Sequence, residues 1–281
     1  MGRKAAVAVL ALFAAGCGRT DHIVVGSKNF TEQFILGEIA AQQLENRLGR
    51  KVDRKLNLGG TLLAHNALVY GEIDLYPEYT GTALTAVLKQ EPNRSSAEVL
   101  GRVRDGYRRW NVEWLDPLGF NNTFAMAIRG EDARRDGVRT LSGARRRRWI
   151  LGAGYEFANR PDGLAGFQKT YDLPLDGAPV TMDLGLLYQA LEQKRIDMAA
   201  ANSTEGLLFA KDFVVLEDDQ HFFPPYEAAF AIRASLPGQA RLALAELSGR
   251  FTDTTMRRLN YEVAGKHRAV ADVARDFLAG R

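Results

Sequence analysis

Three short segments of the sequence combine residue types that can hold a small anion. Ser27 to Thr31, Gly59 to Thr61 and Tyr79 to Thr82 each follow a predicted strand and precede a predicted helix. Glycines allow a close approach to the backbone, threonine hydroxyls can donate hydrogen bonds, and Lys28 adds a positive charge. Free N–H groups at the helix starts add partial positive charge. Together the segments suit a carboxylate, although each one alone is equally typical of a capped helix start.

Aromatic side chains lie in loops or at strand ends that face the expected cleft. A ring face beside a helix N-terminus suits a ligand with a cation at one end and a carboxylate at the other. For Phe222 and Phe223, packing at an interlobe hinge is an equal alternative. The aromatic residues in question are Tyr76, Tyr79, Phe124, Phe222, Phe223 and Tyr226.

Catalytic and metal-binding motifs are missing from the sequence. It has no G-x-S-x-G elbow, no Walker loop and no G-x-G-x-x-G after a strand. One Cys and four His give no zinc-binding spacing. Acidic residues at 217–219 beside His221 are more typical of a solvated loop than of an active site. We therefore expect a binding protein without enzymatic activity, cofactor or metal.

The N-terminus resembles a secretory signal. Arg3 and Lys4 precede an apolar stretch, and the small residues of 14–16 precede Cys17. This arrangement is similar to a bacterial lipobox, although Ala14 stands where Leu is usual. It predicts a signal peptide over residues 1–16 and a lipidated Cys17 as the first mature residue. The alternative is ordinary cleavage nearby, which would leave a spare thiol.

The remaining chain is expected to be soluble and held at the membrane only by its lipid, because no further apolar run approaches 18 residues. The formal charge falls from +3 to +1 when residues 1–16 are removed, since they contain two basic and no acidic residues. The four arginines of 145–148 are the one dense basic run, which is more typical of a solvated surface than of a polyanion site. Nucleic-acid binding is not expected.

Hydrophobic periodicity predicts an α/β fold of alternating strands and helices. Asn29 and Glu32 form an N-x-x-E capping box, and Gly49 ends the helix that follows. Pro224 and Pro225 interrupt the second alternation, after which one strand and three helices most simply complete the first sheet. We expect two lobes, residues 21–122 plus 227–281 and an inserted lobe of 123–226. Strands are predicted at 22–26, 51–58, 73–76, 124–128, 149–152, 196–201, 213–216 and 228–233.

Six motifs occur in order along the chain. They are S-K-N-F-T-E-Q-F-I-L-G-E at 27–38, G-E-I-D-L-Y-P-E-Y-T-G-T at 71–82, P-L-G-F-N-N-T-F-A at 117–125, R-P-D-G-L at 160–164, D-L-G-L-L-Y-Q-A-L at 183–191 and F-F-P-P-Y at 222–226. With these motifs the chain resembles the substrate-binding proteins of osmoprotectant ABC importers, the group that binds glycine betaine, choline, carnitine and proline betaine. The resemblance spans nearly all of the mature chain. It implies a two-lobed periplasmic-binding-protein (Venus-flytrap) fold, with a mixed, mostly parallel sheet in each lobe.

The resemblance also implies roles for particular residues. Tyr79 and Tyr226 match two tyrosines of the family's quaternary-ammonium cage, and Thr82 matches a polar contact. The remaining residues that match ligand-lining positions are Lys28, Gln33 and Arg160.

Two residues depart from the family pattern. Phe124 stands where relatives commonly have Tyr, and it keeps the ring face but loses the hydroxyl. Asn202, in N-S-T-E-G, stands where many relatives have Tyr before S-T-D-G, and it keeps neither the face nor the bulk.

The expected function is that of an extracytoplasmic, membrane-anchored lipoprotein. As a monomer it would capture a quaternary-ammonium osmoprotectant and deliver it to an ABC permease with its ATPase. Because Asn202 makes room in the cage, a different zwitterion, such as a ring-containing betaine or an amino acid, is the alternative ligand. An extracytoplasmic enzyme and a sensor module are the other two readings.

Overall fold

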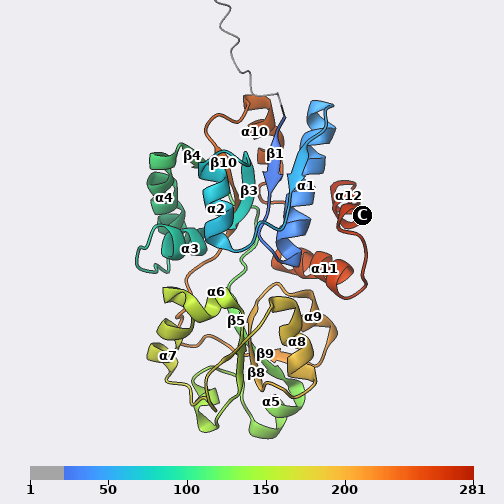
Figure 1. The fold of residues 1–281 in the computed structure, drawn as a ribbon. Coiled ribbons are helices and arrows are strands. Elements are labelled where there is room, and N and C mark those ends of the chain that lie inside the picture. Colours follow the sequence, from blue (N-terminus) through green and yellow to red (C-terminus); the bar gives the residue numbers. More distant parts are fainter. Residues whose placement is uncertain (1–21) are drawn as a thin grey trace, which may run out of the picture.

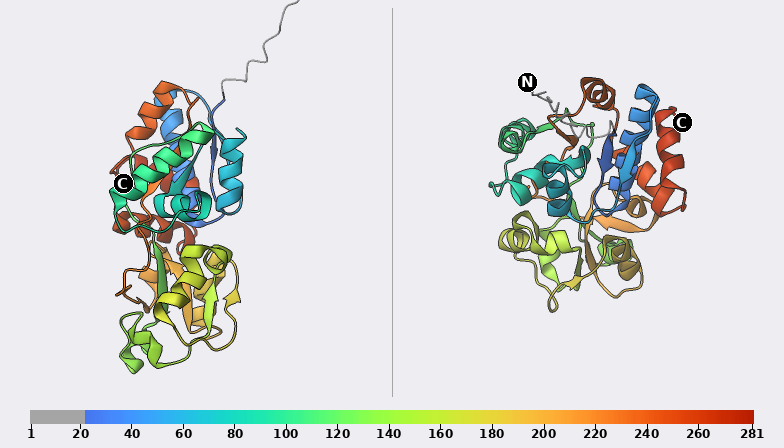
Figure 2. Two further views of the ribbon diagram at one scale, coloured as in Figure 1. Left: turned by 90° about the vertical axis from the view of Figure 1, so that its left-hand side faces the viewer. Right: turned by 45° about the horizontal axis from the view of Figure 1, so that its top comes forward.

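The computed structural model describes residues 22–281, and its two lobes are stacked with the chain crossing twice between them (Figures 1 and 2). The predicted signal peptide and Cys17 lie outside the described residues. Lobe I contains the beginning and the end of the described chain, and lobe II contains its middle part.

Lobe I is built on a five-stranded sheet in the order β2-β1-β3-β10-β4. Its strands are β1 (Val24–Gly26), β2 (Asp53–Lys55), β3 (Leu75–Tyr79), β4 (Val112–Trp114) and β10 (Ala228–Arg233). Its α-helices are α1 (Thr31–Leu48), α2 (Thr61–Val69), α3 (Thr80–Thr82), α4 (Ser96–Tyr107), α10 (Gly238–Ala245), α11 (Asp253–Ala264) and α12 (Val270–Leu278), and a π-helical turn at Ala83–Val87 extends α3.

Lobe II is built on a second five-stranded sheet in the order β7-β6-β8-β5-β9. Its strands are β5 (Phe124–Arg129), β6 (Leu151–Ala153), β7 (Val180–Thr181), β8 (Met198–Asn202) and β9 (Phe213–Val215). Its α-helices are α5 (Gly130–Asp136), α6 (Tyr155–Asn159), α7 (Gly166–Tyr171), α8 (Leu184–Glu192) and α9 (Gly206–Ala210), and a π-helical turn at Pro161–Ala165 links α6 to α7.

Each sheet contains one strand that runs against the other four. In lobe I this strand is β10, which is antiparallel to both β3 and β4. In lobe II it is β5, antiparallel to both β8 and β9. Both reversed strands follow a crossing between the lobes, so each enters its sheet from the side where the other strands end. The predicted two-lobed α/β fold with mostly parallel sheets is confirmed.

Local sequence signals account for most helix boundaries, but one prediction is wrong. Helix α1 ends at Gly49, whose φ of 65° is left-handed. The Asn29–Glu32 capping box does not form: the N-cap is Phe30, without a side-chain cap. Glu32 instead turns toward the crossing segments, where buried donors compete for its carboxylate. Strand β3 also continues to Tyr79, beyond the predicted end at Tyr76.

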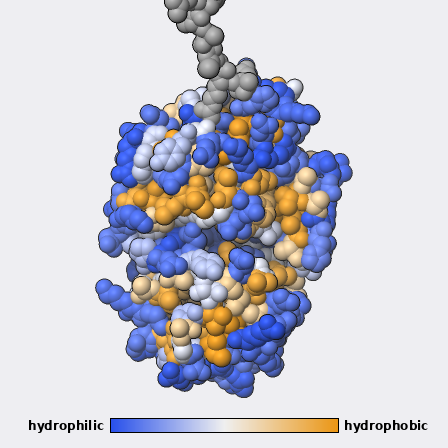
Figure 3. Space-filling model, in the orientation of Figure 1, coloured by the Kyte–Doolittle hydropathy of each residue, from blue (hydrophilic) through white to orange (hydrophobic). Residues whose placement is uncertain are grey.

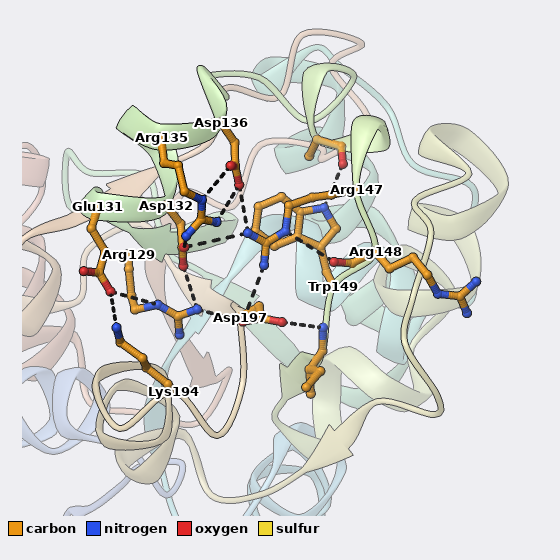
Figure 4. A network of polar contacts seen from close by, with 12 residues as sticks. Arg129, Glu131, Asp132, Arg135, Asp136, Arg147, Arg148, Trp149, Lys194 and Asp197 are labelled. Atoms are coloured by element: carbon orange, nitrogen blue, oxygen red, sulfur yellow. Dashed lines mark hydrogen bonds and ion pairs between the residues drawn. The ribbon is translucent and has the colours of Figure 1, made fainter.

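Three of the four arginines at 145–148 pair with acids of lobe II, and Figure 4 shows the pairs of Arg147. Arg147 lies 2.8 Å from Asp136, contacts Asp197 at 3.5 Å and stacks 4.1 Å from the Trp149 ring centroid. Arg145 pairs with Asp172. These contacts place the run in the structural framework of lobe II, away from the gap between the lobes.

Candidate ligand-binding cleft

A cleft of about 850 Å³ lies between the two lobes. It opens at the carboxyl ends of the parallel strands, where the loops after β1, β2 and β3 face those after β6, β7 and β8. This is where ligands bind in open α/β sheets. Figure 3 shows the surface hollowed between the lobes, with hydrophobic residues above and below the hollow.

The cleft brings together seven of the eight ligand-binding residues predicted from the sequence. These are Lys28, Tyr79, Thr82, Phe124, Arg160, Asn202 and Tyr226. The eighth, Gln33, is fully buried behind Lys28, where its Oε1 accepts a hydrogen bond from the Lys28 backbone N–H. Its role in ligand binding stays a prediction.

Lys28 of lobe I is already paired with a carboxylate of the protein. Its Nζ lies 2.5 Å from Oε1 of Glu78, and both side chains are buried. The same Nζ lies 4.7 Å from the centroid of the Tyr79 ring. Lys28 therefore stacks its charge on the ring that the resemblance assigns to the ligand's cation.

Glu32 is a buried carboxylate that connects the two lobes behind Tyr79. Its oxygens accept hydrogen bonds from Tyr79 Oη at 2.6 Å and Asn122 Nδ2 at 2.8 Å. Thr204 Oγ1 of lobe II donates at 2.5 Å, and Asn260 Nδ2 of α11 donates at 3.0 Å. Burial raises the pKa of Glu32, and the four donors offset part of that effect. Glu32 orients the Tyr79 ring through its hydroxyl.

Arg160 of lobe II is also paired inside the protein. Its Nε donates to Asp162 Oδ1 at 2.9 Å, and its Nη2 contacts the other oxygen of the same carboxylate. Although burial favours the neutral acid, Arg160 holds the pKa of Asp162 below its usual value. Arg160 Nη1 donates to Thr82 Oγ1 of lobe I at 3.0 Å, so this contact spans the cleft.

The three aromatic residues predicted to hold the cation all line the cleft: Tyr79, Phe124 and Tyr226. Phe124 lies 5.7 Å from Tyr226 between centroids, edge to face, and the Arg160 guanidinium lies 5.1 Å from the Phe124 centroid. Tyr226 approaches lobe I at Gly81, where a Cβ would come within 2.7 Å of its ring. Only glycine allows this approach, which explains the T-G-T sequence after Tyr79.

The other predicted cleft aromatics lie elsewhere. Tyr76 is buried in a core of lobe I, where its hydroxyl contacts Glu78. Phe222 and Phe223 pack on Phe167 in lobe II, and Phe223 also contacts Phe124. The alternative of hinge packing therefore describes Phe222 and Phe223 better.

The expected anion site at the start of α2 is occupied by a protein carboxylate. Glu156 Oε1 accepts a hydrogen bond from the Thr61 backbone N–H at 3.0 Å, and Oε2 accepts one from the Thr61 hydroxyl at 3.2 Å. The segment therefore binds a carboxylate of the protein itself, because α6 of lobe II brings Glu156 to it, and its use by a ligand stays a prediction.

Sequence reasoning missed two polar residues of the cleft beside the predicted Asn202. Glu205 follows β8, and Tyr188 belongs to α8. Burial and the nearby Glu32 raise the pKa of Glu205 to about 8. Tyr188 lies within the D-L-G-L-L-Y-Q-A-L motif. Its spacing along the predicted helix is the same as that of a core residue, so the sequence pattern does not mark it as a cleft residue.

The structure gives no indication of a metal centre or a membrane span in residues 22–281. No group of three or more His, Cys, Asp or Glu side chains there is arranged to hold a metal ion. None of the helices in that range is both long and apolar enough to cross a bilayer.

Two lobes that close a polar and aromatic cleft define a solute-binding protein. The chain belongs to the family described as the substrate binding domain of ABC-type glycine betaine transport system, whose model matches residues 21–280. It is 32% identical to the carnitine transport binding protein OpuCC of Listeria monocytogenes over 94% of this chain and 88% of that protein.

Two further comparisons support the assignment. The chain is 34% identical to the ergothioneine transport permease/ergothioneine binding protein EgtU of Helicobacter pylori, covering 91% of this chain and 47% of that protein. A crystal structure described as a glycine betaine/carnitine/choline ABC transporter superposes with a TM-score of 0.76 and 31% identity, covering 92% of this chain and 98% of that one.

Proposed function

We propose that this protein captures a quaternary-ammonium osmoprotectant, such as glycine betaine or choline, outside the cytoplasm and delivers it to an ABC permease. The observation that carries the proposal is the convergence of Tyr79, Phe124 and Tyr226 on one interlobe cleft. The faces of these rings suit a trimethylammonium group, because that group has no N–H to donate in a hydrogen bond. Thr82 and Arg160 supply polar groups at the same cleft.

The proposal includes the anchoring and organisation of the chain. A lipid on Cys17 after removal of residues 1–16 would hold the protein at the membrane surface. The lobes would comprise residues 21–122 plus 227–281 and residues 123–226, and the protein would act as a monomer.

Thermal unfolding of the mature protein tests the ligand class. A ligand at a hundred times its Kd stabilises the folded state by about 2.7 kcal/mol, which for a chain of this size raises Tm by roughly 5–10 °C. We expect such a rise with glycine betaine, choline or carnitine. No rise with any trimethylammonium compound would contradict the proposal.

A ring-containing betaine is the second candidate, because Asn202 leaves space where relatives have a tyrosine. The relative named for ergothioneine, itself a betaine with a ring, is 34% identical. We expect Asn202→Tyr to tighten binding of glycine betaine by about two- to thirtyfold, through one added cation–π contact. In the same variant, isothermal titration should show weaker binding of ergothioneine if the ring occupies this space.

A further inference from the structure

Glu32 divides its two carboxylate oxygens between the cleft and the opposite lobe. Oε1 accepts hydrogen bonds from the hydroxyl of Tyr79, at 2.6 Å, and from Asn122 Nδ2 at the first crossing between the lobes, at 2.8 Å. Oε2 accepts from Thr204 Oγ1 of lobe II, at 2.5 Å, and from Asn260 Nδ2 of α11, at 3.0 Å. One carboxylate therefore joins an aromatic ring of the cleft to lobe II.

Lobe II presents Thr204 to Glu32 through the contact of α9 with α11, and Figure 1 shows α11 of lobe I above α9. Thr204 lies between β8 and α9, and its carbonyl oxygen accepts a further hydrogen bond from Asn260 Nδ2, at 2.8 Å. A Cβ added at Gly206 would lie 2.3 Å from the backbone nitrogen of Tyr261, so only glycine allows α9 this close to α11. The hydrogen bond from Thr204 to Glu32 thus depends on how one lobe is placed against the other.

Glu32 and Thr204 both lie outside the wall of the cleft. Their side chains are 2% and 1% exposed, and neither belongs to the residues that line the interlobe cavity. The four donors to Glu32 named above are neutral side chains, so the loss of one leaves a buried carboxylate with one hydrogen bond fewer. A change in ligand affinity caused by Thr204 must therefore act through the arrangement of the lobes.

We propose that Glu32 is a positioning residue that couples ligand binding at the Tyr79 ring to closure of the lobes, through its hydrogen bond to Thr204. The inference rests on the proposed function, because it concerns the same cleft, and it adds two residues outside the cavity that set the affinity. In the closed arrangement Glu32 keeps all four donors. When the lobes separate, Glu32 loses Thr204, and Asn260 loses one of its two acceptors.

The expected size of the effect follows from the charge of Glu32. A hydrogen bond to an ionised group is roughly twice as strong as a neutral one. Because the bond is made only in the closed state, its loss lowers the ratio of closed to open protein about ten- to hundredfold. The closed protein holds the ligand, so the apparent Kd rises by the same factor. Most of this change is expected in koff, as for most changes in affinity.

Isothermal titration with glycine betaine and with choline, together with stopped-flow measurement of koff, tests the inference. Thr204→Val replaces the hydroxyl by a methyl group of similar size and should raise Kd and koff about ten- to hundredfold. Thr204→Ser keeps the hydroxyl and should bring Kd back to within about threefold of the unmodified protein. Thr123→Val is the matched control, because the buried Thr123 hydroxyl has no hydrogen-bond partner within residues 22–281, and it should change Kd less than about twofold.

The double variant Tyr79→Phe/Thr204→Val tests whether both hydroxyls act through the same carboxylate. Tyr79→Phe keeps the ring and removes one donor to Oε1 of Glu32. Once Thr204→Val has broken the connection to lobe II, the Tyr79 hydroxyl has no further influence on closure. We therefore expect Tyr79→Phe to weaken binding less in the Thr204→Val protein than in the unmodified protein. Equal factors in the two proteins would show independent hydrogen bonds and would overturn the coupling.

An unchanged Kd in Thr204→Val would overturn the inference. An equal loss in Thr204→Ser would do the same, because the packing of the side chain and not its hydroxyl would then be responsible. Gly206→Ala decides the matter if Thr204→Val does not fold: its Cβ forces α9 away from α11 outside the cleft wall, so Kd should rise, and an unchanged Kd would exclude the coupling. Failure of the unmodified protein to bind either compound would instead remove the proposed function, on which the inference rests.

Discussion

The carboxylate of Glu156 in lobe II accepts two hydrogen bonds from Thr61 in lobe I, one from its backbone N–H and one from its hydroxyl. The two residues are 95 positions apart, and they meet only because the lobes are closed on each other. Helices α9 and α11 make the other large contact between the lobes. Glu156 therefore acts as a latch on the cleft side of the closed arrangement.

Glu156→Ala should weaken ligand binding without unfolding the protein. Each net hydrogen bond contributes about 0.5–1.5 kcal/mol, so a smaller closed population should raise the apparent Kd about two- to tenfold. Isothermal titration measures this change. Glu192→Ala is the control, because Glu192 pairs with Lys211 on the exposed surface. Equal Kd values for the Glu156 variant and the unmodified protein would show that the latch does not contribute to closure.

Tyr79→Ala should weaken ligand binding more than Tyr107→Ala does. Tyr79 lines the cleft, whereas Tyr107 is buried in lobe I among His65, Trp110 and Trp114. We expect the loss of one cation–π wall to weaken a trimethylammonium ligand about two- to thirtyfold. Tyr107→Ala should lower Tm and leave the Kd of the folded protein nearly unchanged. Similar Kd values for the two variants would contradict the aromatic cage.

Tyr79→Phe separates the ring from its hydroxyl. The variant keeps the aromatic face but removes one of the four donors to the buried Glu32. We expect unfolding in urea to show a loss of about 1–3 kcal/mol, because a buried acceptor loses a partner. Ligand affinity should change less than in Tyr79→Ala. An unchanged free energy of unfolding would mean that Glu32 finds another donor.

The stability of the ligand-free protein should fall as pH rises toward 8. Burial raises the pKa of Glu205 to about 8, so between about pH 4.5 and 8 the folded state keeps a proton that the unfolded chain releases. The slope from this group is at most about 1.4 kcal/mol per pH unit. The titratable groups facing Glu205 are Glu32 of α1 and Tyr188 of α8, and Arg257 of α11 donates to the nearby Ser203 carbonyl.

Urea unfolding at pH 6, 7 and 8 measures this dependence. Glu205→Gln should flatten the slope, because the amide does not titrate. The pKa of Glu32 is also raised, so this group adds a slope of the same sign at pH values up to its own raised pKa. An identical slope in the variant and the unmodified protein would show that Glu205 is not the titrating group.

Arg147→Ala should destabilise lobe II, whereas Arg146→Ala should have little effect. Arg147 contacts Asp132, Asp136 and Asp197, and it is only 26% exposed (Figure 4). Its loss leaves these partly buried carboxylates short of a donor, at about 1–3 kcal/mol. Arg146 is exposed in the same run. Neither variant should alter the Kd for the ligand. Calorimetry measures the Tm of both variants, and equal values would argue against a stabilising role of the Arg147 ion pairs.

The sequence by itself determined the elements and where their loops lie. Hydrophobic periodicity placed β10 at its observed bounds, and Gly49 marked the end of α1. These signals are local, since they depend on residues within one helix or strand. Seven predicted residues reached the cleft because the carboxyl ends of parallel strands meet at one edge of a sheet.

Only the tertiary structure decided which charges remain free for a ligand. Lys28 meets Glu78 across 50 residues, Thr61 meets Glu156 across 95, and Thr204 meets Glu32 across 172. No local pattern encodes such pairs, because they depend on how two sheets and two lobes are placed in space. The sequence therefore revealed a set of loops that suits an anion, and packing joined Lys28 and Thr61 of those loops to carboxylates of the same protein.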